Sequence, residues 1–497
     1  MQCRAWLLVV GMAASGAGLV SVVAVSVCAN EPPMHDELIS VALHKTIGTA
    51  AATPAQRARA ERQARLPVKM GGLGVTPQAA IADAACVGSW ALIWRPMQQL
   101  CPQLFAGVEL EKAPQPAFKE LRAAKERLME THRRVAAVHS HWDTTYFDYD
   151  KDGEGCSQFH PDGLPKAKEL LPLSQYGTDD DKLQGVQRKY SSVIHHAAWL
   201  KLLITFQGVS RREAVRFIAV SQPSAGAFLN AVPRHKGFRL PTWSLRLLIQ
   251  RRLGLPLLAA AAAAGARRSR HGRRFDALGD VAQSDGALGH ATRHFLINNS
   301  LYDAMRRVYG GMVAREPAIY HGYSDHWSDL TLLLEGQLTA FDLKVFDPIG
   351  STPAETAERG AYVGFGNTSE RCREVVLGRR ERGREGDGVF NRRTGAGHVK
   401  AKAGDYERAL ENGVEVVPLL VETFGGFGSG LVAMLKAAAE WRHDRLDASE
   451  YDETTWAARK YTPFVTQKLS VAVHLSMAQE IAEALGLSVA ADPRDSA

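Results

Sequence analysis

The stretch that decides the fold is WSDLTLLLEGQLTAFDLKVFDP, residues 327–348. Two apolar runs flank residues 335–337, an arrangement typical of a β-hairpin. Side chains alternate between the two faces of a strand, so Phe341, Leu343 and Val345 are expected to enter a core together. The stretch therefore predicts a hairpin with one apolar and one polar face.

The polar face of this hairpin carries three charged groups. Asp342 and Lys344 share it, and Asp329 begins the partner strand at the same end of the hairpin. Two carboxylates can hold Mg²⁺ or Mn²⁺, because these ions prefer hard oxygen ligands. Such an ion polarises a phosphodiester and lowers the pKa of a bound water, while a neighbouring lysine can stabilise the developing charge. The pattern predicts a nuclease centre; the alternative is a salt-bridged hairpin edge without chemistry.

Helix-type patterns dominate the chain before residue 275. They cover residues 34–65, 76–92 (with Thr76 as the N-cap), 113–139, 186–205, 210–221 and 242–252. After residue 275 a helix is expected over 291–308, then strands over 312–319, 330–334, 339–346 and 414–422, then helices over 430–441 and 461–485. The predicted class is α+β or α/β: a helical N-terminal half followed by an α/β domain with a small mixed sheet.

Length and composition limit the classes of protein. At roughly 150 residues per domain, 497 residues predict two to four units. Hydrophobic residues make up 45% and charged residues 23%, which excludes wholesale disorder. Six cysteines exclude a disulfide scaffold. We expect units at residues 30–232 and 275–497, joined by a basic linker over residues 233–274.

The basic residues are concentrated in that linker. The net charge is +7, and residues 233–274 hold eleven Lys or Arg and no Asp or Glu, so the remainder carries 7 − 11 = −4. A block of one sign indicates a polyanionic partner, DNA or RNA. The alternative is a solvated helix face followed by an arginine-rich linker. The residues expected to contact nucleic acid are Arg246, Arg251, Arg252, Arg267, Arg268, Arg270, Arg273 and Arg274.

The N-terminus contains an apolar segment. Residues 5–29 lack charge and end in Val27-Cys28-Ala29, a sequence that a signal peptidase accepts. Residues 1–29 therefore predict a secretory signal peptide, or a membrane anchor if the segment is not cleaved. The alternative is a buried, alanine- and valine-rich helix.

From about residue 65 onward the chain resembles the C-terminal part of non-LTR retrotransposon polyproteins, the region that follows the reverse-transcriptase palm. The resemblance is carried by blocks in the family's order: residues 65–74 (RLPVKMGGLG), 222–233, 252–256, 276–280 with Arg293 and His294, 327–329, 341–344, Lys400 and Lys402 with Tyr406, and 421–426. The last four blocks resemble a PD-(D/E)XK restriction-endonuclease-like domain.

The resemblance implies nicking of target DNA by Asp329, Asp342 and Lys344. It further implies that Lys400 or Lys402, on a following helix, supplements Lys344, and that Glu316 is an additional acid near the metal. The implied cofactor is Mg²⁺ or Mn²⁺, with no small-molecule cofactor, and the implied location is the nucleus.

The chain departs from the family in two respects. The polymerase palm is absent, and residues 267–294, where the family has a zinc knuckle, contain no cysteine, so we expect no zinc. Both departures indicate a truncated, degenerate element. Three hypotheses stay open: a metal-dependent DNA endonuclease, a non-catalytic nucleic-acid-binding relic, and a secreted protein if residues 1–29 are removed on export.

Overall fold

The computed structural model describes most of the chain between residues 32 and 487. The described residues are 6–9, 23–26, 32–105, 107–142, 164–170, 172–176, 185–222, 224–265, 269, 272–284, 289–316, 328–349, 372–381, 398, 400–454 and 457–487. Within them, helices predominate and are accompanied by one mixed four-stranded sheet and a two-stranded ladder. The predicted α+β class is confirmed.

The described N-terminal residues form strands β1 (Trp6–Val9) and β2 (Val23–Ser26), which pair antiparallel. Both lie in the apolar segment predicted to be a signal peptide or an anchor. No described helix has the length and apolarity needed to cross a membrane. Helices α1 (Pro32–Ile47) and α2 (Pro54–Ala64) follow, as predicted for residues 34–65.

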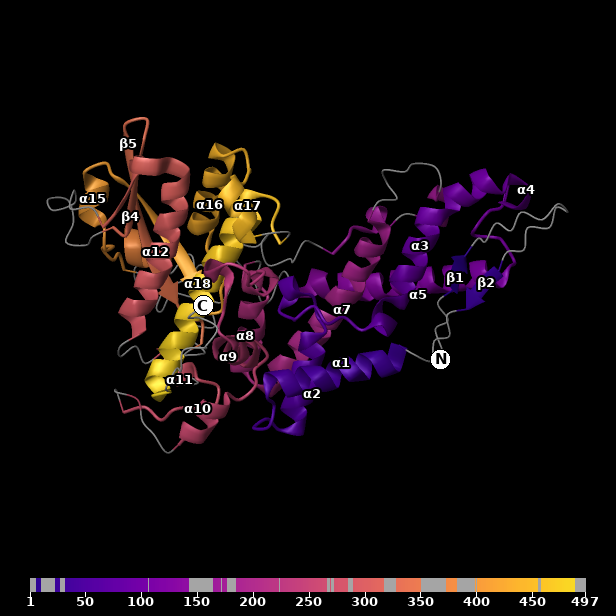
Figure 1. The fold of residues 1–497 in the computed structure, drawn as a ribbon, viewed down its shortest axis with the longest axis horizontal. Coiled ribbons are helices and arrows are strands. Elements are labelled where there is room, and N and C mark those ends of the chain that lie inside the picture. Colours follow the sequence, from indigo (N-terminus) through magenta and orange to yellow (C-terminus); the bar gives the residue numbers. More distant parts are fainter. Residues whose placement is uncertain are drawn as a thin grey trace.

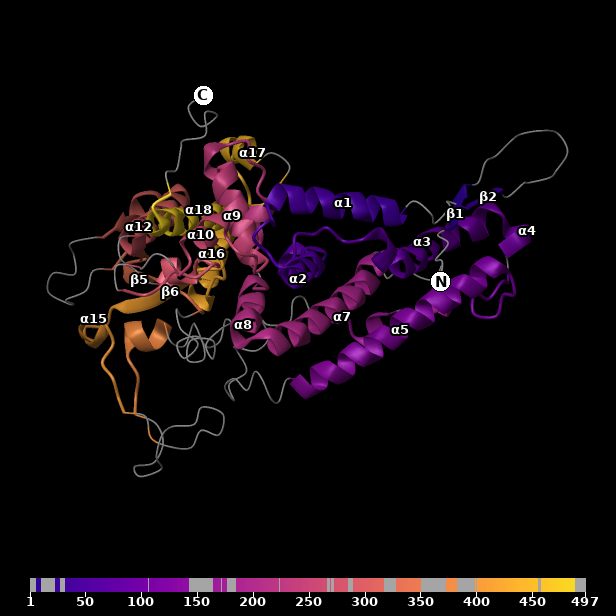
Figure 2. The same ribbon diagram turned by 90° about the horizontal axis from the view of Figure 1, so that it is seen from below.

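Three long helices form an arm that extends away from the sheet: α3 (Gln78–Leu100), α5 (Pro116–Trp142) and α7 (Val186–Val209) (Figures 1 and 2). Short α4 (Pro102–Phe105) follows α3. The arm has its own core, in which Phe118 meets the rings of Trp90 and Trp94 at 5.2 and 5.7 Å between centroids. Aromatic edge contacts of this kind stabilise the arm beyond simple burial.

The start of α3 differs from the prediction. Pro77, not Thr76, is the N-cap, and no side chain caps the helix. The hydroxyl of Thr76 instead donates a hydrogen bond to the Arg65 carbonyl at 3.2 Å. The polar group expected to begin the helix therefore stabilises the preceding turn.

Between the arm and the sheet lie four shorter helices: α8 (Arg211–Val220), α9 (Thr242–Arg252), α10 (Leu258–Ala263) and α11 (Asp280–Ser284). Apolar residues of α9 and of the segment after it share a buried cluster with α18 (Tyr461–Leu485). The prediction of a linker over residues 233–274 is therefore wrong as far as Ala260, because residues up to that point contribute to buried clusters.

The sheet has the order β3 (Val313–Arg315), β4 (Leu330–Leu334), β5 (Gln337–Phe346) and β6 (Glu415–Glu422). The β4–β5 pair is the predicted antiparallel hairpin, with Leu330 opposite Phe341. Strand β6 runs parallel to β5 and places Leu419 beside Leu343. A parallel neighbour needs a long crossover connection, which residues 347–414 supply.

Helices cover both faces of this sheet. On one face, Phe341 and Leu343 pack with α12 (Gly289–Tyr309), α16 (Ser429–Trp441) and α18. On the other face, Ala340 packs with α15 (Glu407–Glu411) and residues 372–377. Helix α17 (Ala448–Thr454) and the 3₁₀ turns complete the described elements: Val68–Met70, Ala167–Glu169, Leu173–Gln175, Ala227–Asn230, Lys236–Phe238 and Gly310–Met312.

Candidate active site

Strand β5 places two charged side chains on one face of the sheet. Asp342 and Lys344 are two residues apart, so they point the same way, while Leu343 between them points into the opposite core. The Nζ of Lys344 lies 3.0 Å from Oδ2 of Asp342 and 3.3 Å from Oδ2 of Asp405. The predicted pair is therefore adjacent, and Asp405 joins it.

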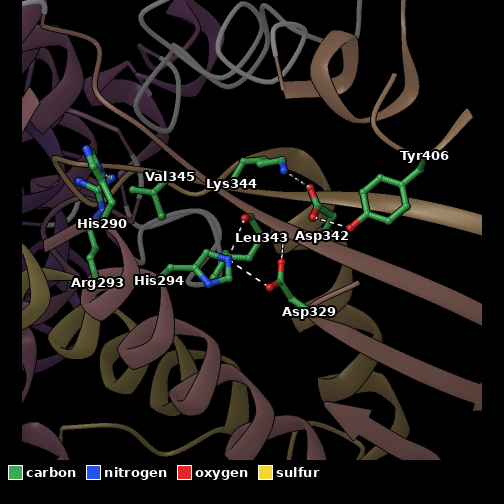
Figure 3. A pocket seen from close by; sticks show the side chains of 9 residues that line it. All are labelled: His290, Arg293, His294, Asp329, Asp342, Leu343, Lys344, Val345 and Tyr406. Carbon is green, nitrogen blue, oxygen red and sulfur yellow. Dashed lines mark hydrogen bonds and ion pairs between the residues drawn. The ribbon is translucent and has the colours of Figure 1, made fainter. Parts of the chain in front are cut away.

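Asp329 meets this pair from the end of the neighbouring strand. Its backbone N–H donates to the Phe341 carbonyl at 3.0 Å, which continues the β4–β5 ladder by one residue. Its Oδ2 accepts the Leu343 N–H at 2.5 Å, and its Oδ1 lies 3.1 Å from Nε2 of His294 on α12. Asp329 is buried, so these partners fix its carboxylate beside Asp342 (Figure 3).

Tyr406 holds the second carboxylate from the other side. Its buried hydroxyl donates a 2.8 Å hydrogen bond to Oδ1 of Asp342. Tyr406 immediately precedes α15, which packs against the same face of the sheet. One oxygen of Asp342 therefore has a fixed donor, while the other faces Lys344.

Burial and charge set the protonation of these groups. Burial raises the pKa of Asp342, Lys344 lowers it, and the neighbouring charge of Asp329 raises it further, leaving it above its ordinary value. Burial acts against the charged form of Lys344, yet Asp342 and Asp405 leave its pKa raised. The hydrogen bond to Asp329 raises the pKa of His294. Lys344 is therefore a cation at neutral pH.

These side chains surround a cavity of about 340 Å³ (Figure 3). Two acids and Lys344 occupy one part of its wall, and basic groups of α12 occupy another. The lining residues are His290, Arg293, His294, Asp329, Asp342, Leu343, Lys344, Val345 and Tyr406. The cavity thus offers carboxylates for a cation next to positive groups for an anion.

The donor set fits a small hard cation. Oδ2 of Asp342 is buried and lies 3.0 Å from Nζ of Lys344. No group of three His, Cys, Asp or Glu side chains in the described part of the chain could hold an ion. Mg²⁺ commonly takes one or two carboxylates and completes its shell with waters and substrate phosphates. Asp329 and Asp342 supply two carboxylates at this cavity, and their oxygens contact the Leu343 N–H, His294, Tyr406 and Lys344.

Glu316 and Lys400 lie outside this cavity. Glu316 has an exposed side chain and a φ of 42°, and only its backbone, whose N–H donates to the Asp329 carbonyl, is near the site. Lys400 is exposed, and the prediction that it lies on a helix is wrong, because α15 begins at Glu407. Lys402 pairs with Arg379 in an isolated bridge. None of them lines the cavity.

Sequence reasoning missed the roles of Asp405 and His294. His294 was expected only as part of a zinc-knuckle-like block, and it instead contacts Asp329 and the Leu343 carbonyl. Asp405 lies in a turn before α15, where no spacing rule connects it to a strand 60 residues earlier. Both contacts depend on tertiary packing, for which the sequence gives no local signal.

Two of the predicted nucleic-acid contacts are buried structural arginines. Arg251 and Arg252 are each 3% exposed, so the prediction that they bind phosphates is wrong. The guanidinium of Arg252 donates to the carbonyls of Val68, Gly72 and Ala225. Of the others, Arg246, Arg273 and Arg274 are exposed, whereas Arg267, Arg268 and Arg270 lie outside the described residues.

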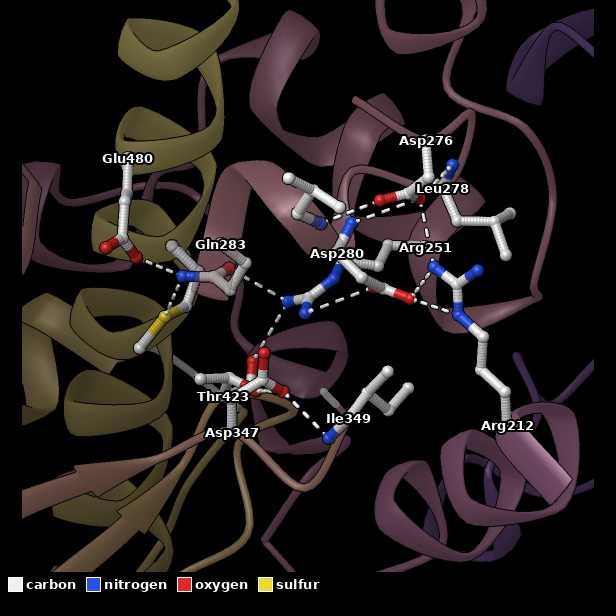
Figure 4. Close-up of polar contacts among 12 residues, drawn as sticks. Arg212, Arg251, Asp276, Leu278, Asp280, Gln283, Asp347, Ile349, Thr423 and Glu480 are labelled. Carbon is white, nitrogen blue, oxygen red and sulfur yellow. Dashed lines mark hydrogen bonds and ion pairs between the residues drawn. The ribbon is translucent and has the colours of Figure 1, made fainter. Parts of the chain in front are cut away.

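Arg251 belongs to a buried polar network behind the cavity (Figure 4). Its Nη1 donates to Oε1 of Gln283 at 3.0 Å, and its Nη2 lies 3.7 Å from Oδ1 of Asp280. Gln283 also donates to Glu480, which pairs with Arg293 of the cavity wall at 2.7 Å. The network therefore connects the wall of the cavity to the helices that join it to the arm.

We expect Glu480→Gln to change how stability depends on pH. Burial raises the pKa of Glu480 from 4.5 to about 7, although Arg293 opposes the shift. Between these two pH values the folded protein binds a proton at Glu480 that the unfolded protein does not bind. The free energy of unfolding of the wild type therefore falls as pH rises through this range. The variant should therefore gain stability relative to the wild type by about 1–3 kcal/mol between pH 5 and pH 8.

Urea unfolding at several pH values measures this difference. Glu483→Gln, on the exposed side of the same helix, is the matched control and should show no such trend. A constant difference between Glu480→Gln and the wild type would mean that Glu480 does not change its protonation on folding.

No protein-family model matches the sequence, and no curated protein matches it significantly.

Proposed function

We propose that this chain is a divalent-metal-dependent DNA endonuclease of the restriction-endonuclease-like type, derived from a non-LTR retroelement. The observation that carries the proposal is the meeting of Asp329, Asp342 and Lys344 at one cavity. Two carboxylates beside a lysine, on neighbouring strands of a mixed sheet, are suited to hydrolysis of a phosphodiester.

Each group has a separate task in this proposal. Asp329 and Asp342 would hold the ion, which supplies Lewis-acid polarisation of the phosphodiester. Lys344 would donate a hydrogen bond to a phosphate oxygen and offset the negative charge that develops there. Tyr406 and His294 orient the two carboxylates through their hydrogen bonds, which keeps the oxygens in place before DNA arrives.

The retroelement origin rests on the resemblance of the sequence blocks, three of which are in contact in the structure. Arg252, in the block 252–256, donates hydrogen bonds to the backbone of residues 68 and 72 and of residue 225, in the blocks 65–74 and 222–233. Three segments widely separated in sequence thus form one structural unit.

The proposal predicts metal-dependent nicking. The purified full-length chain should convert supercoiled plasmid to open circles in millimolar Mg²⁺ or Mn²⁺, and excess EDTA should abolish the conversion because the acids alone supply no electrophile. Restoring the metal should restore nicking. Equal nicking with and without EDTA would contradict the assignment of the two acids to a metal.

A non-catalytic DNA-binding role is the second candidate. It is favoured by the pairing of every charged group at the site, Lys344 with Asp342 and Asp405, and Asp329 with His294. Such ion pairs could simply stabilise the edge of the sheet without any catalytic role. Salt-sensitive DNA binding without nicking in any divalent metal would support this role against the first.

A further inference from the structure

Helix α12 has a second functional face besides the one at the cavity. Its inner face, with Ile297, Leu301 and Met305, is buried in the core of the sheet. Its outer side carries Phe295 and, beside it, Tyr302, which is half-buried and packs partly against that core. Phe295 is 52% exposed, and the guanidinium of Arg315 lies over its ring.

The outer residues form a continuous stripe. Phe295, Asn299, Tyr302 and Arg306 are spaced by four, three and four positions, which aligns them along one side of a helix. Arg315 on β3 lies across from them, with its guanidinium carbon 5.6 Å from the Phe295 ring and 5.9 Å from the Tyr302 ring. We call these five residues the aromatic–arginine stripe.

The polar groups of the stripe hold the rings in place. Arg306 lies 5.7 Å from the Tyr302 ring and donates to its hydroxyl at 2.8 Å, and Arg315 donates to Asn299. At exposed sites such cation–π contacts contribute only about 0.5–1 kcal/mol each. A stacking partner would therefore have to displace only weak contacts to reach the ring faces.

The stripe lies near the candidate active site, because Arg315 pairs with Leu330, the residue after Asp329. It is on another side of α12 from the residues that line the cavity. His290, Arg293 and His294 line the cavity, and Phe295 is the next residue on the same helix. From Phe295 to Tyr302 the helix rises about 10 Å, the length of about three stacked nucleotides at 3.4 Å each. A strand with its phosphate in the cavity could therefore lay its flanking bases along this face.

We propose that the aromatic–arginine stripe binds the unpaired bases of a single DNA strand adjacent to the cavity. Aromatic rings and guanidinium planes accept bases of any sequence by stacking, which is how proteins bind single strands without sequence preference. Asp303 and Glu316 are exposed nearby and offset the charge of the two arginines. Stacking, more than charge, supplies the affinity. The inference rests on the proposed function only for the choice of DNA.

Fluorescence anisotropy in EDTA tests the proposal without cleavage. The full-length chain is titrated into a labelled single-stranded oligonucleotide and, separately, into its duplex. Phe295→Leu with Tyr302→Leu should weaken single-strand binding by about tenfold or more and duplex binding by less than about twofold, since stacking is lost for unpaired bases only. Phe295→Trp should retain the single-strand affinity.

Tyr451→Leu is the matched control, because Tyr451 is 48% exposed on α17, outside the stripe. It should leave both affinities unchanged. Equal weakening of single strand and duplex, or no weakening, would overturn the proposal. Failure of this proposal can be distinguished from failure of the proposed function. If the chain does not nick DNA but the stripe discriminates single strand from duplex, only the nuclease proposal fails. If the chain nicks DNA but the stripe does not discriminate, only the stripe proposal fails.

Discussion

Asp342→Asn should reduce plasmid nicking by about a thousandfold or more while leaving the fold intact. The substitution removes the negative charge that attracts a divalent ion, and loss of one ligand from a two-carboxylate site removes several kcal/mol of transition-state stabilisation. The asparagine keeps an oxygen that can accept the Tyr406 hydroxyl. The substitution therefore removes the charge of the side chain and keeps its hydrogen bond with Tyr406.

The free energy of unfolding of Asp342→Asn provides a second test of the same prediction. Burial raises the pKa of Asp342, so the folded protein disfavours its ionised form. A neutral amide at this position should leave the free energy of unfolding at pH 7 unchanged or slightly higher. An inactive variant that unfolds more easily would show instead that Asp342 stabilises the sheet, as in the non-catalytic interpretation.

Lys344→Ala should also abolish most nicking, by about a hundredfold to a thousandfold, because it removes the charged donor that we propose stabilises the reacting phosphate. Glu316→Gln and Lys400→Ala are the matched controls. Both residues are exposed and lie outside the cavity, so both variants should keep the wild-type nicking rate. The rates come from the decay of supercoiled plasmid on gels. Residual nicking by Asp342→Asn at the wild-type rate would indicate a contaminating nuclease or another catalytic centre.

The sequence was sufficient to predict the elements around this site. Period-2 alternation from Phe341 to Val345 predicts which side chains are buried, and in the structure Phe341 and Leu343 lie in the core while Asp342 and Lys344 face the other side. Long helices such as α7 and α18 were predicted because their apolar positions recur with a helical period. Local sequence patterns were therefore sufficient to predict these strands and helices and which side chains of β5 are buried.

Contacts between distant segments were not predictable in the same way. A run of arginines reveals its charge but not its surroundings, so Arg251 and Arg252 were interpreted as surface cations. Arg251 contacts Gln283, and Arg252 contacts the carbonyls of Val68 and Gly72. No sequence pattern around these partners indicates that a cation is buried beside them. The burial of Arg252 reflects the shape of a glycine-containing turn some 180 residues earlier.

That turn explains why an arginine is used. Gly71 has a φ of 86°, a conformation that favours glycine, and a Cβ on Gly72 would lie 2.0 Å from the Leu66 carbonyl oxygen. The Val68 carbonyl accepts the Gly71 N–H at 3.2 Å within this turn, and the side chain of Arg252 donates to both the Val68 and the Gly72 carbonyls. Buried carbonyls need donors, and a planar guanidinium can supply several at once.

We therefore expect Arg252→Ala to be the most destabilising substitution considered, by about 3–5 kcal/mol. It removes hydrogen bonds to Val68 O at 2.7 Å, Ala225 O at 2.8 Å and Gly72 O at 3.2 Å. Val68 O keeps the Gly71 N–H, and each buried carbonyl that is left unpaired costs about 1–3 kcal/mol. A cavity left by the side chain adds to the loss. Urea unfolding followed by circular dichroism measures it.

The charge of Arg252 is not the source of this stability. Burial and the nearby Arg216 lower the pKa of Arg252 to about 9, so the folded state disfavours the cation. The stability comes from the planar guanidinium, which holds several donors in fixed directions. Arg252→Lys keeps the charge but not this geometry, so it should recover less than half of the lost free energy of unfolding. Arg246→Ala, on the exposed side of α9, should change stability by less than about 0.5 kcal/mol. If Arg252→Ala instead unfolded like the wild type but lost DNA affinity, Arg252 would be a phosphate contact after all, and its burial would have to be relieved when DNA binds.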